Sequence, residues 1–302
     1  MLFRSCGDAV EANALLVDAN GVPAAAQQVV YSDNSEDPRV GGAFDGTNYV
    51  VTYTDADGAD WNVLNRRIAP DGTMSAPALV RTLNNPVYDL TTIGHADGRY
   101  SVLFQDSSNG TTTDIAVINV AVDNAVTSAA DVSNAARAHS SPDVASDGTN
   151  FLSVFHSFNQ DEDVLMAVRL NQQGQPIESE PFTVVPDAWN PGGYQVGFFA
   201  GRYVVTFTGT GPQGTMIYAQ QVGSDGQLVG GPVALTGGMS MGDLSVLGDR
   251  MIVAGNSNEG SLQVSRRFGR IFDANFVPVT DRFEFGSGRS APRLTARNNQ
   301  RS

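Results

Sequence analysis

A tight turn followed by a strand of β-branched and aromatic residues recurs along this chain, and the repetition constrains the fold more than any other feature. The first copy, FDGTNYVVTY, spans residues 44–53. The first large residues after the five turns are Tyr49, Tyr100, Phe151, Tyr203 and Met251, at intervals of 51, 51, 52 and 48 residues. A period near 50 residues in an all-strand pattern predicts an array such as a propeller, with one small sheet per repeat.

A second series of turns has the same period. It consists of Gly21, Gly72, Asn124, Gly174, Gly226 and Ala274, of which Asn124 and Ala274 are degenerate members. Two series in phase predict four strands, A to D, in each repeat. In the first repeat we expect them at 38–43, 49–54, 61–68 and about 76–81. The segment 128–136 is the best candidate for a helix in this all-β pattern.

The ends of the chain predict the number of blades. Five copies of strand B are visible, but six of the C–D hairpin, and residues 290–296 resemble a strand A. Joining the ends gives an interval of 52 residues from Met251 to Met1. We therefore expect a single six-bladed β-propeller, closed by strand A from the C-terminus with strands B–D from the N-terminus. The expected blades are 287–302 with 1–33, 34–84, 85–135, 136–186, 187–237 and 238–286.

The position of Met1 inside an expected strand B leaves two alternatives open. The chain is a segment of a longer or permuted array, or Met1 is its natural start. The first residues lack the pattern of a signal peptide, and the single cysteine, Cys6, excludes an intrachain disulfide. Because a segment can lack its targeting signal, we expect an extracellular or cell-surface protein.

The charge of the chain restricts its partners. The net charge is −14, and all 18 basic residues are arginine. Nucleic acids and anionic membrane surfaces need a basic face, so both are disfavoured as partners. No apolar run is long enough for membrane insertion. Many aspartates occupy turns, which favours turn chemistry and solubility over a calcium-rich or saline environment.

One family resemblance extends over nearly the whole chain. The segment Ser141–Phe155 (SPDVASDGTNFLSVF) followed by Arg169–Gly174 (RLNQQG) resembles propeller repeats of bacterial secreted and surface proteins. The resemblance implies a fold and no particular activity, because its motif residues are structural. The chain departs from other propeller families: it has no WD dipeptide series, no kelch double glycine and no sialidase box.

The acidic segment DADGAD is the best candidate for a metal site. Asp55, Asp57 and Asp60 surround a glycine, as in the calcium loops of some propellers, and carboxylate oxygens suit this hard cation. The equivalent segments of the other repeats do not share the pattern. A solvated acidic loop is the favoured alternative, and calcium is the only cofactor that the sequence suggests.

Two of the three histidines are candidates for a ligand-binding site. His139 precedes strand A of one repeat, and His156 closes strand B of the same repeat. The two could approach each other and, with Asp161 or Glu162, form a metal or general-base site. Two exposed loop histidines are the favoured alternative.

Trp61 and Trp189 are further candidates, because they do not recur with the period. Trp189 lies in a loop bounded by proline and glycine, where an exposed indole could stack on a sugar or anchor a partner. Packing over a neighbouring blade is the slightly favoured alternative. The eight aromatic residues that do recur are expected between the blades.

These features favour a non-enzymatic binding module that recognises a protein or glycan through the loops on one face of the propeller. A hydrolase or lyase with a site at the central channel, assisted by calcium, is one alternative. A structural domain of a larger surface protein is another. The sequence supplies no catalytic residue set.

Overall fold

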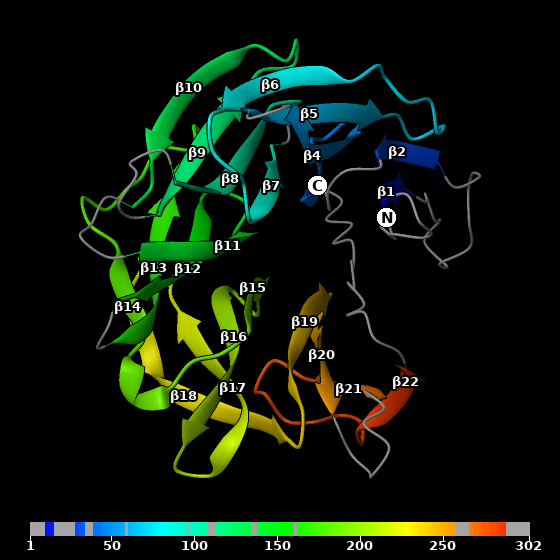
Figure 1. The fold of residues 1–302 in the computed structure, drawn as a ribbon. Helices are drawn as coiled ribbons and strands as arrows, with labels where there is room; N and C mark the ends of the chain where they lie inside the picture. The colour runs from blue at the N-terminus through cyan, green and yellow to red at the C-terminus, as the bar shows by residue number, and fades with distance from the viewer. Residues whose placement is uncertain are drawn as a thin grey trace. The chain divides into compact units, whose positions relative to one another are not determined.

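A computed structural model gives the structure of residues 10–14, 28–33, 39–57, 60–95, 97–107, 113–133, 138–159, 162–257 and 266–287. Most of these residues lie in strands or in the turns between them, and none lies in an α-helix (Figure 1). The fold is all-β, as the sequence predicts.

The described strands form one two-stranded and five four-stranded antiparallel sheets. In each four-stranded sheet, strands that are consecutive in the chain are hydrogen-bonded neighbours. The two-stranded sheet is β1 (Val10–Ala14) with β2 (Gln28–Asp33). Sheet 1 is β3 (Val40–Phe44), β4 (Tyr49–Asp57), β5 (Asp60–Ile68) and β6 (Ala78–Leu83). Sheet 2 is β7 (Leu90–Gly94), β8 (Tyr100–Asp106), β9 (Asp114–Val120) and β10 (Val126–Asp131).

The remaining three sheets repeat the same order. Sheet 3 is β11 (Ala138–Ser146), β12 (Phe151–Phe158), β13 (Asp163–Leu170) and β14 (Phe182–Val185). Sheet 4 is β15 (Tyr194–Phe199), β16 (Arg202–Gly211), β17 (Gly214–Val222) and β18 (Leu228–Gly237). Sheet 5 is β19 (Ser240–Leu247), β20 (Arg250–Ser257), β21 (Arg266–Phe272) and β22 (Phe283–Ser287).

Contacts divide the chain into two compact units. The first comprises Met1–Pro142 with Leu170–Glu180 and holds β1, β2 and sheets 1 and 2. The second comprises Asp143–Arg169 with Pro181–Ser302 and holds most of sheet 3 together with sheets 4 and 5.

Each four-stranded sheet has two different ends. At one end, which we call the turn end, the first strand connects to the second and the third to the fourth. At the other, the loop end, the second strand connects to the third. Among the described residues, both predicted turn series lie at the turn end, and Gly21 lies outside these residues. The period of the sequence therefore reflects the geometry of this end.

The third and fourth strands are joined by the same turn in all five sheets. Its last central residue has a positive φ and donates its N–H to the carbonyl three residues earlier. The residues with positive φ are Gly72, Asn124, Gly174, Gly226 and Phe276. A type I turn followed by a left-handed residue is a common hairpin connection, and glycine and asparagine suit the left-handed position.

The structure moves the last member of this series from Ala274 to Phe276. Phe276 has φ 60°, and its N–H donates to Asp273 O over 3.0 Å. A phenylalanine in this conformation is uncommon. Its side chain is buried in an apolar cluster with Met251 and Phe268, and this burial offsets the backbone strain.

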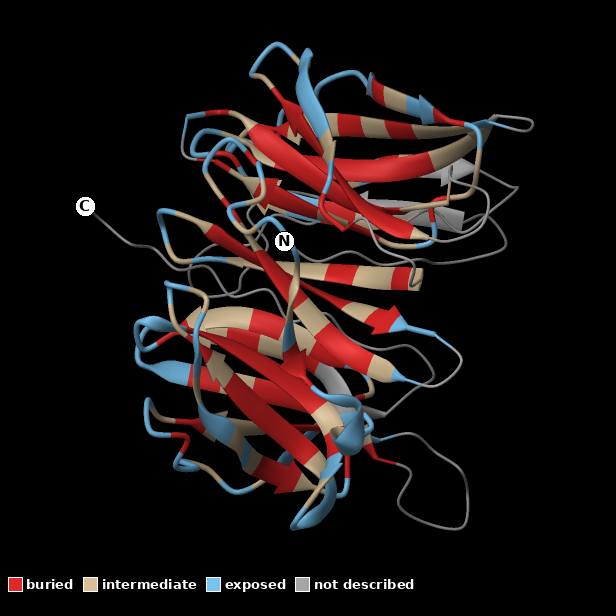
Figure 2. Cartoon of the chain, turned by 90° about the vertical axis from the view of Figure 1, so that its left-hand side faces the viewer, coloured by how far each residue is buried: buried red, intermediate tan, exposed pale blue. Residues whose placement is uncertain are grey.

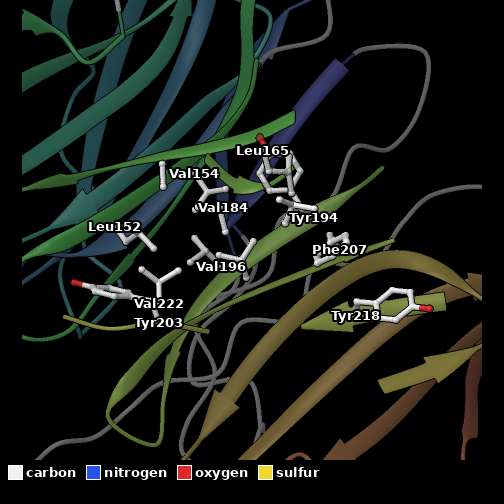
Figure 3. Close-up of a cluster of buried hydrophobic side chains, with 13 residues drawn as sticks. Leu152, Val154, Leu165, Val184, Tyr194, Val196, Tyr203, Phe207, Tyr218 and Val222 are labelled. Atoms are coloured by element: carbon white, nitrogen blue, oxygen red, sulfur yellow. The ribbon is translucent and has the colours of Figure 1, made fainter. Parts of the chain in front are cut away.

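Consecutive sheets pack face to face through apolar layers. In the first unit, Val50 and Val63 of sheet 1 join Tyr100, Val102 and Phe104 of sheet 2. In the second unit, one layer joins sheets 3 and 4 (Figure 3) and another joins sheets 4 and 5. The second strands are buried over most of their length, whereas several outer strands mix buried and half-buried residues (Figure 2). Of the recurring aromatic residues, seven are buried and Tyr49 is half-buried. Tyr100, Phe104, Tyr203 and Phe207 lie in the layers between sheets, as predicted.

Arg67 joins sheets 1 and 2 at their turn ends. Its guanidinium forms an ion pair with the fully buried carboxylate of Asp45 in the first turn of its own sheet. It also donates to the carbonyls of Gly98 (3.1 Å) and Ala121 (3.2 Å) in sheet 2 and lies 5.3 Å from the ring centre of Tyr100. One side chain therefore connects the two sheets by hydrogen bonds and a cation–π contact, while its ion pair holds it in its own sheet.

Arg169 occupies the corresponding place in sheet 3. It donates to Ser224 O of sheet 4 over 2.6 Å. The hydroxyl of Tyr203 in sheet 4 donates to Asn150 O in the first turn of sheet 3. Sheets 3 and 4 thus repeat the cross-sheet contact of sheets 1 and 2.

Two predictions about local structure need correction. Residues 128–131 of the expected helix lie instead in β10, which pairs with β9 from Val126 to Asp131. Pairing with a sheet overrides the helical composition of such a short segment. In sheet 1, β6 begins two residues later than predicted, at Ala78.

The structure does not establish the number of blades. Residues 1–9 and 288–302, which would supply the closing strands, lie outside the described residues. The hairpin β1–β2 is present, and Ala14 and Val30 pack with Val51 and Tyr53 of sheet 1. The five four-stranded sheets are consistent with a propeller, and six blades closed by the two termini stay a prediction.

We predict that Arg67→Ala lowers the free energy of unfolding by about 3 kcal/mol, because it leaves the Asp45 carboxylate buried without its partner. Arg99→Ala is the control, since Arg99 pairs with Asp97 at the surface and its loss should cost less than about 1 kcal/mol. Urea unfolding measures both. Equal losses in the two variants would contradict the role of Arg67.

We predict that Gly174→Ala destabilises the chain more than Gly148→Ala, although both glycines have positive φ. A Cβ atom at Gly174 would overlap Asn119 Oδ1, whereas nothing lies within 4 Å of one at Gly148. Backbone strain costs about 1 kcal/mol at each position, and the overlap adds roughly 1 to 3 kcal/mol at Gly174. Thermal unfolding of both variants tests the difference, and equal stabilities would count against the contact with Asn119.

Candidate functional site

The loop ends of the sheets carry the residues that differ most among the repeats. The segments that connect the second and third strands are 58–59, 107–113, 159–162, 212–213 and 258–265. The turn ends, by contrast, repeat one hairpin geometry five times. Binding residues are commonly found on variable loops held by a regular scaffold, so the loop ends are the candidate site.

The acidic segment of sheet 1 is a hairpin rather than a loop. The strands β4 and β5 stay paired out to Asp57 and Asp60, and Asp55 pairs with Asn62. The carboxylate of Asp55 accepts a hydrogen bond from the Tyr31 hydroxyl over 3.0 Å. The side chain of Asp57 lies outside the described residues. Among the side chains that the structure places, no group of three potential ligands could hold a metal ion.

His139 is buried at the loop end of sheet 2. Its Nδ1 lies 3.4 Å from Asp114 Oδ1, and its N–H donates to Thr113 O over 2.7 Å. The side chains of His139 and Asp114 are 1% and 5% exposed. The expectation of an exposed loop histidine is therefore wrong for His139, which packs beside the first residue of β9.

Carboxylates gather around the same loop end. Asp106 and Asp114 are paired across β8 and β9, and Asp131 ends the neighbouring strand β10. Partial desolvation raises the pKa of the Asp131 carboxyl, the charges of Asp114 and Asp106 raise it further, and Arg81 opposes them. This end of sheet 2 has a negative field, which disfavours anionic ligands.

His156 lies in the second unit and has its own carboxylate partner. Its Nδ1 lies 2.7 Å from Asp163 Oδ1, and its ring lies 5.0 Å from that of Tyr194. The N–H of Asp163 donates to Asp187 Oδ1 over 2.9 Å. The pair fixes the imidazole at the border of β12 and β13. His139 and His156 thus belong to different units, each with a separate aspartate.

Trp189 is half-buried and packs on the core of its own sheet. It ends the short 3-10 helix η1 (Asp187–Trp189), and its ring meets those of Tyr218 (5.0 Å) and Phe207 (6.3 Å) edge to face. A Cβ atom at Gly211 would overlap the indole, so this glycine makes room for it. Trp189 therefore packs on aromatic residues of its own sheet, and not over a neighbouring blade as the alternative expected.

Trp61 is also half-buried. It lies in β5 opposite Ala56 and Leu83 and packs against the apolar layer between sheets 1 and 2.

Sequence reasoning missed the aspartates that partner the histidines, Asp114 and Asp163, and the neighbouring Asp131 and Asp187. Asp114 and Asp163 are the first residues of third strands. Because a third strand begins at the loop end, the sequence positions of these two aspartates could have placed them there. The sequence alone does not show which histidine each would contact.

We predict that Trp189→Ala lowers the free energy of unfolding by roughly 2 kcal/mol, less than for a fully buried tryptophan. Trp189→Phe should recover part of this loss, because a smaller ring can still contact Tyr218. Urea unfolding followed through Trp61 fluorescence reports the change in both variants. Unchanged stability of Trp189→Ala would contradict the packing described above.

Comparison with known proteins identifies the fold but no family. No family model and no curated protein matches the chain. A prolyl endopeptidase structure is similar over 92% of this chain and 40% of its own, with a TM-score of 0.54 and 14% identity. An ACO/RPE65 chimera is similar over 89% of this chain and 65% of its own, with a TM-score of 0.50 and 10% identity.

This chain thus spans about 40% of the length of the prolyl endopeptidase. A third similar structure, the WD40 domain of SCAP from fission yeast, has a TM-score of 0.46 and 10% identity over 93% of this chain and 74% of its own. No helix in the described part of the chain is long and apolar enough to cross a membrane. At these identities the likeness concerns the fold alone, and the structural neighbours are β-propeller-type folds.

Proposed function

We propose that this chain is a non-enzymatic binding module that recognises a protein partner through the loop ends of its sheets. The observation that carries the proposal is the contrast between the two ends. Five identical hairpins occupy the turn ends, whereas the loop-end connections differ in length and composition. A regular scaffold with one variable end is typical of proteins that bind through loops.

The chemistry of the loop ends favours a partner that is not anionic. In the first unit they carry Asp55, Asp60, Asp106, Asp114 and Asp131, and the whole chain has a net charge of −14. In the second unit Phe158 is 39% exposed beside the His156–Asp163 pair. An exposed aromatic ring next to polar groups is suited to a protein interface.

The predictions of location, ligand class and alternative activities from the sequence analysis belong to the same proposal. We propose an extracellular or cell-surface location, with a glycan as the alternative ligand. A calcium-assisted hydrolase or lyase site, or a purely structural role, stays a prediction. The solved neighbours include peptidases and glycosidases as well as a WD40 domain, so the shared fold does not separate these activities.

Two matched double variants test the proposal. Phe158→Ser with Asp187→Asn changes the loop end of the second unit, and Leu247→Ser with Asp225→Asn changes its turn end. Phe158 and Leu247 are both exposed, as are the two aspartates. Wild type and both variants are used for affinity capture from surface and secreted extracts of the source organism, with quantitative mass spectrometry, and for glycan arrays.

We expect a protein that wild type enriches to be lost at least about fivefold from the loop-end variant and kept by the turn-end variant. Loss from the turn-end variant, or equal capture by all three proteins, would contradict recognition at the loop end. Glycan binding that the loop-end variant loses would replace the protein partner by a carbohydrate. No binding in either assay would favour the structural alternative.

A further inference from the structure

The outermost strand of sheet 2, β10, presents an open edge. In the described part of the chain it pairs with β9 alone (Figure 1). Five of its six residues are exposed, and the remaining one, Ala130, is half-buried. The outer strands β6, β14 and β18 each contain two buried residues. An exposed strand with one unpaired edge is a template for pairing with another chain.

The other outer strands carry features that protect an edge from such pairing. Arg81 lies within β6 and Glu284 within β22, β14 has only four residues, and β18 contains the segment 230–232 (GGP). Charges, short length and proline all discourage the addition of a strand. β10 (VTSAAD) has no charge, glycine or proline before its last residue, Asp131. A register shift near its start leaves residues 128–131 in regular pairing with β9.

Alternate backbone groups of β10 point away from β9. The N–H of Val132, the residue after β10, donates to Ile115 O over 2.7 Å and therefore points toward β9. Direction alternates along an antiparallel strand, so the N–H of Ala130 also points toward β9, and those of Ala129 and Asp131 point outward. An added strand would hydrogen-bond to these two residues.

Negative charge gathers near both ends of this edge. Partial burial raises the pKa of the exposed Asp131, the charges of Asp114 and Asp106 raise it further, and Arg81 acts in the opposite sense. Asp123 is exposed in the turn before β10. A cationic side chain beside Asp131 would reduce the repulsion there. A second copy of this chain, with its net charge of −14, would be repelled.

We propose that β10 binds an extended peptide segment of a partner protein, which adds a strand to sheet 2 and places a lysine or arginine beside Asp131. Main-chain hydrogen bonds to Ala129 and Asp131 supply the affinity, and the carboxylates select the basic residue. The edge of β10 is a different surface from the loop-end connections, so this inference goes beyond the proposed function and does not depend on it.

Selection of random linear peptides, displayed on phage, against the full chain provides the probe. We expect the enriched peptides to be rich in β-branched residues and to contain lysine or arginine. With a selected peptide at roughly ten times its Kd, amide hydrogen exchange of Ala129 and Asp131 should slow about tenfold. The amides of Ser128 and Ala130, which already point toward β9, should change little. Enriched peptides without basic residues, protection elsewhere in the chain, or no binding peptide would overturn the proposal.

Substitutions in β10 test the two parts of the contact separately. Ala129→Pro removes an outward N–H without breaking a hydrogen bond to β9, so the sheet should stay folded and peptide affinity should fall about tenfold. Ala129→Thr keeps the N–H and is the matched control, with an expected change below about twofold. Asp131→Asn should weaken basic peptides roughly threefold, and this readout remains if the proline variant does not fold. Unchanged affinity in Ala129→Pro or Asp131→Asn would overturn the proposal.

Two further measurements separate this edge from other binding surfaces. The double variant Phe158→Ser with Asp187→Asn should bind the peptides as wild type does, and loss of binding there would assign them to the loop end instead. Sedimentation of the chain alone should show no self-association through this edge. Dimers that Ala129→Pro abolishes would assign β10 to a second copy of the chain and overturn the proposal.

Discussion

Packing between consecutive sheets is the interaction on which the rest of this structure depends. The apolar faces of the sheets are buried in layers that join sheets 1 and 2 in the first unit, and sheets 3 and 4 and sheets 4 and 5 in the second. The layer between sheets 1 and 2 shows the arrangement, with Val50 and Val63 on one side and Tyr100 and Phe104 on the other. Arg67 adds a polar contact at the border of that layer, where it reaches two carbonyls and an aromatic ring of the neighbouring sheet. Arg169 shows that a second pair of sheets uses the same position.

The two ends of each sheet differ in how regular they are. Some turn-end residues contact the neighbouring sheet, as Arg67 does at Gly98 and Gly174 at Asn119. The hairpin between the third and fourth strands has the same geometry in all five sheets. The connections at the loop ends differ in length from one sheet to the next. The proposed binding function rests on this variation between the loop ends.

The sequence alone predicts the structural features that recur in every repeat. Strand order, the turn glycines and the buried aromatic residues were all accessible, because each recurs about every 50 residues. Features that occur once were not accessible. Phe276 adopts a turn conformation that its residue type does not indicate, and Trp189 packs inward because Gly211, distant in sequence, leaves space for it. His139 reads as a loop residue but is buried beside Asp114, a contact between two strands that no local pattern reveals.

A double-mutant cycle between Arg67 and Tyr100 tests most directly whether a side chain of one sheet stabilises its packing on the next sheet. The two residues belong to different sheets and lie 5.3 Å apart, measured from the guanidinium carbon to the ring centre. The unfolding free energies of Arg67→Ala, Tyr100→Leu and the double variant give their interaction energy. We predict a coupling of about 1 kcal/mol or more for this desolvated cation–π pair. Additive losses, within about 0.3 kcal/mol, would show that the sheets do not depend on this contact.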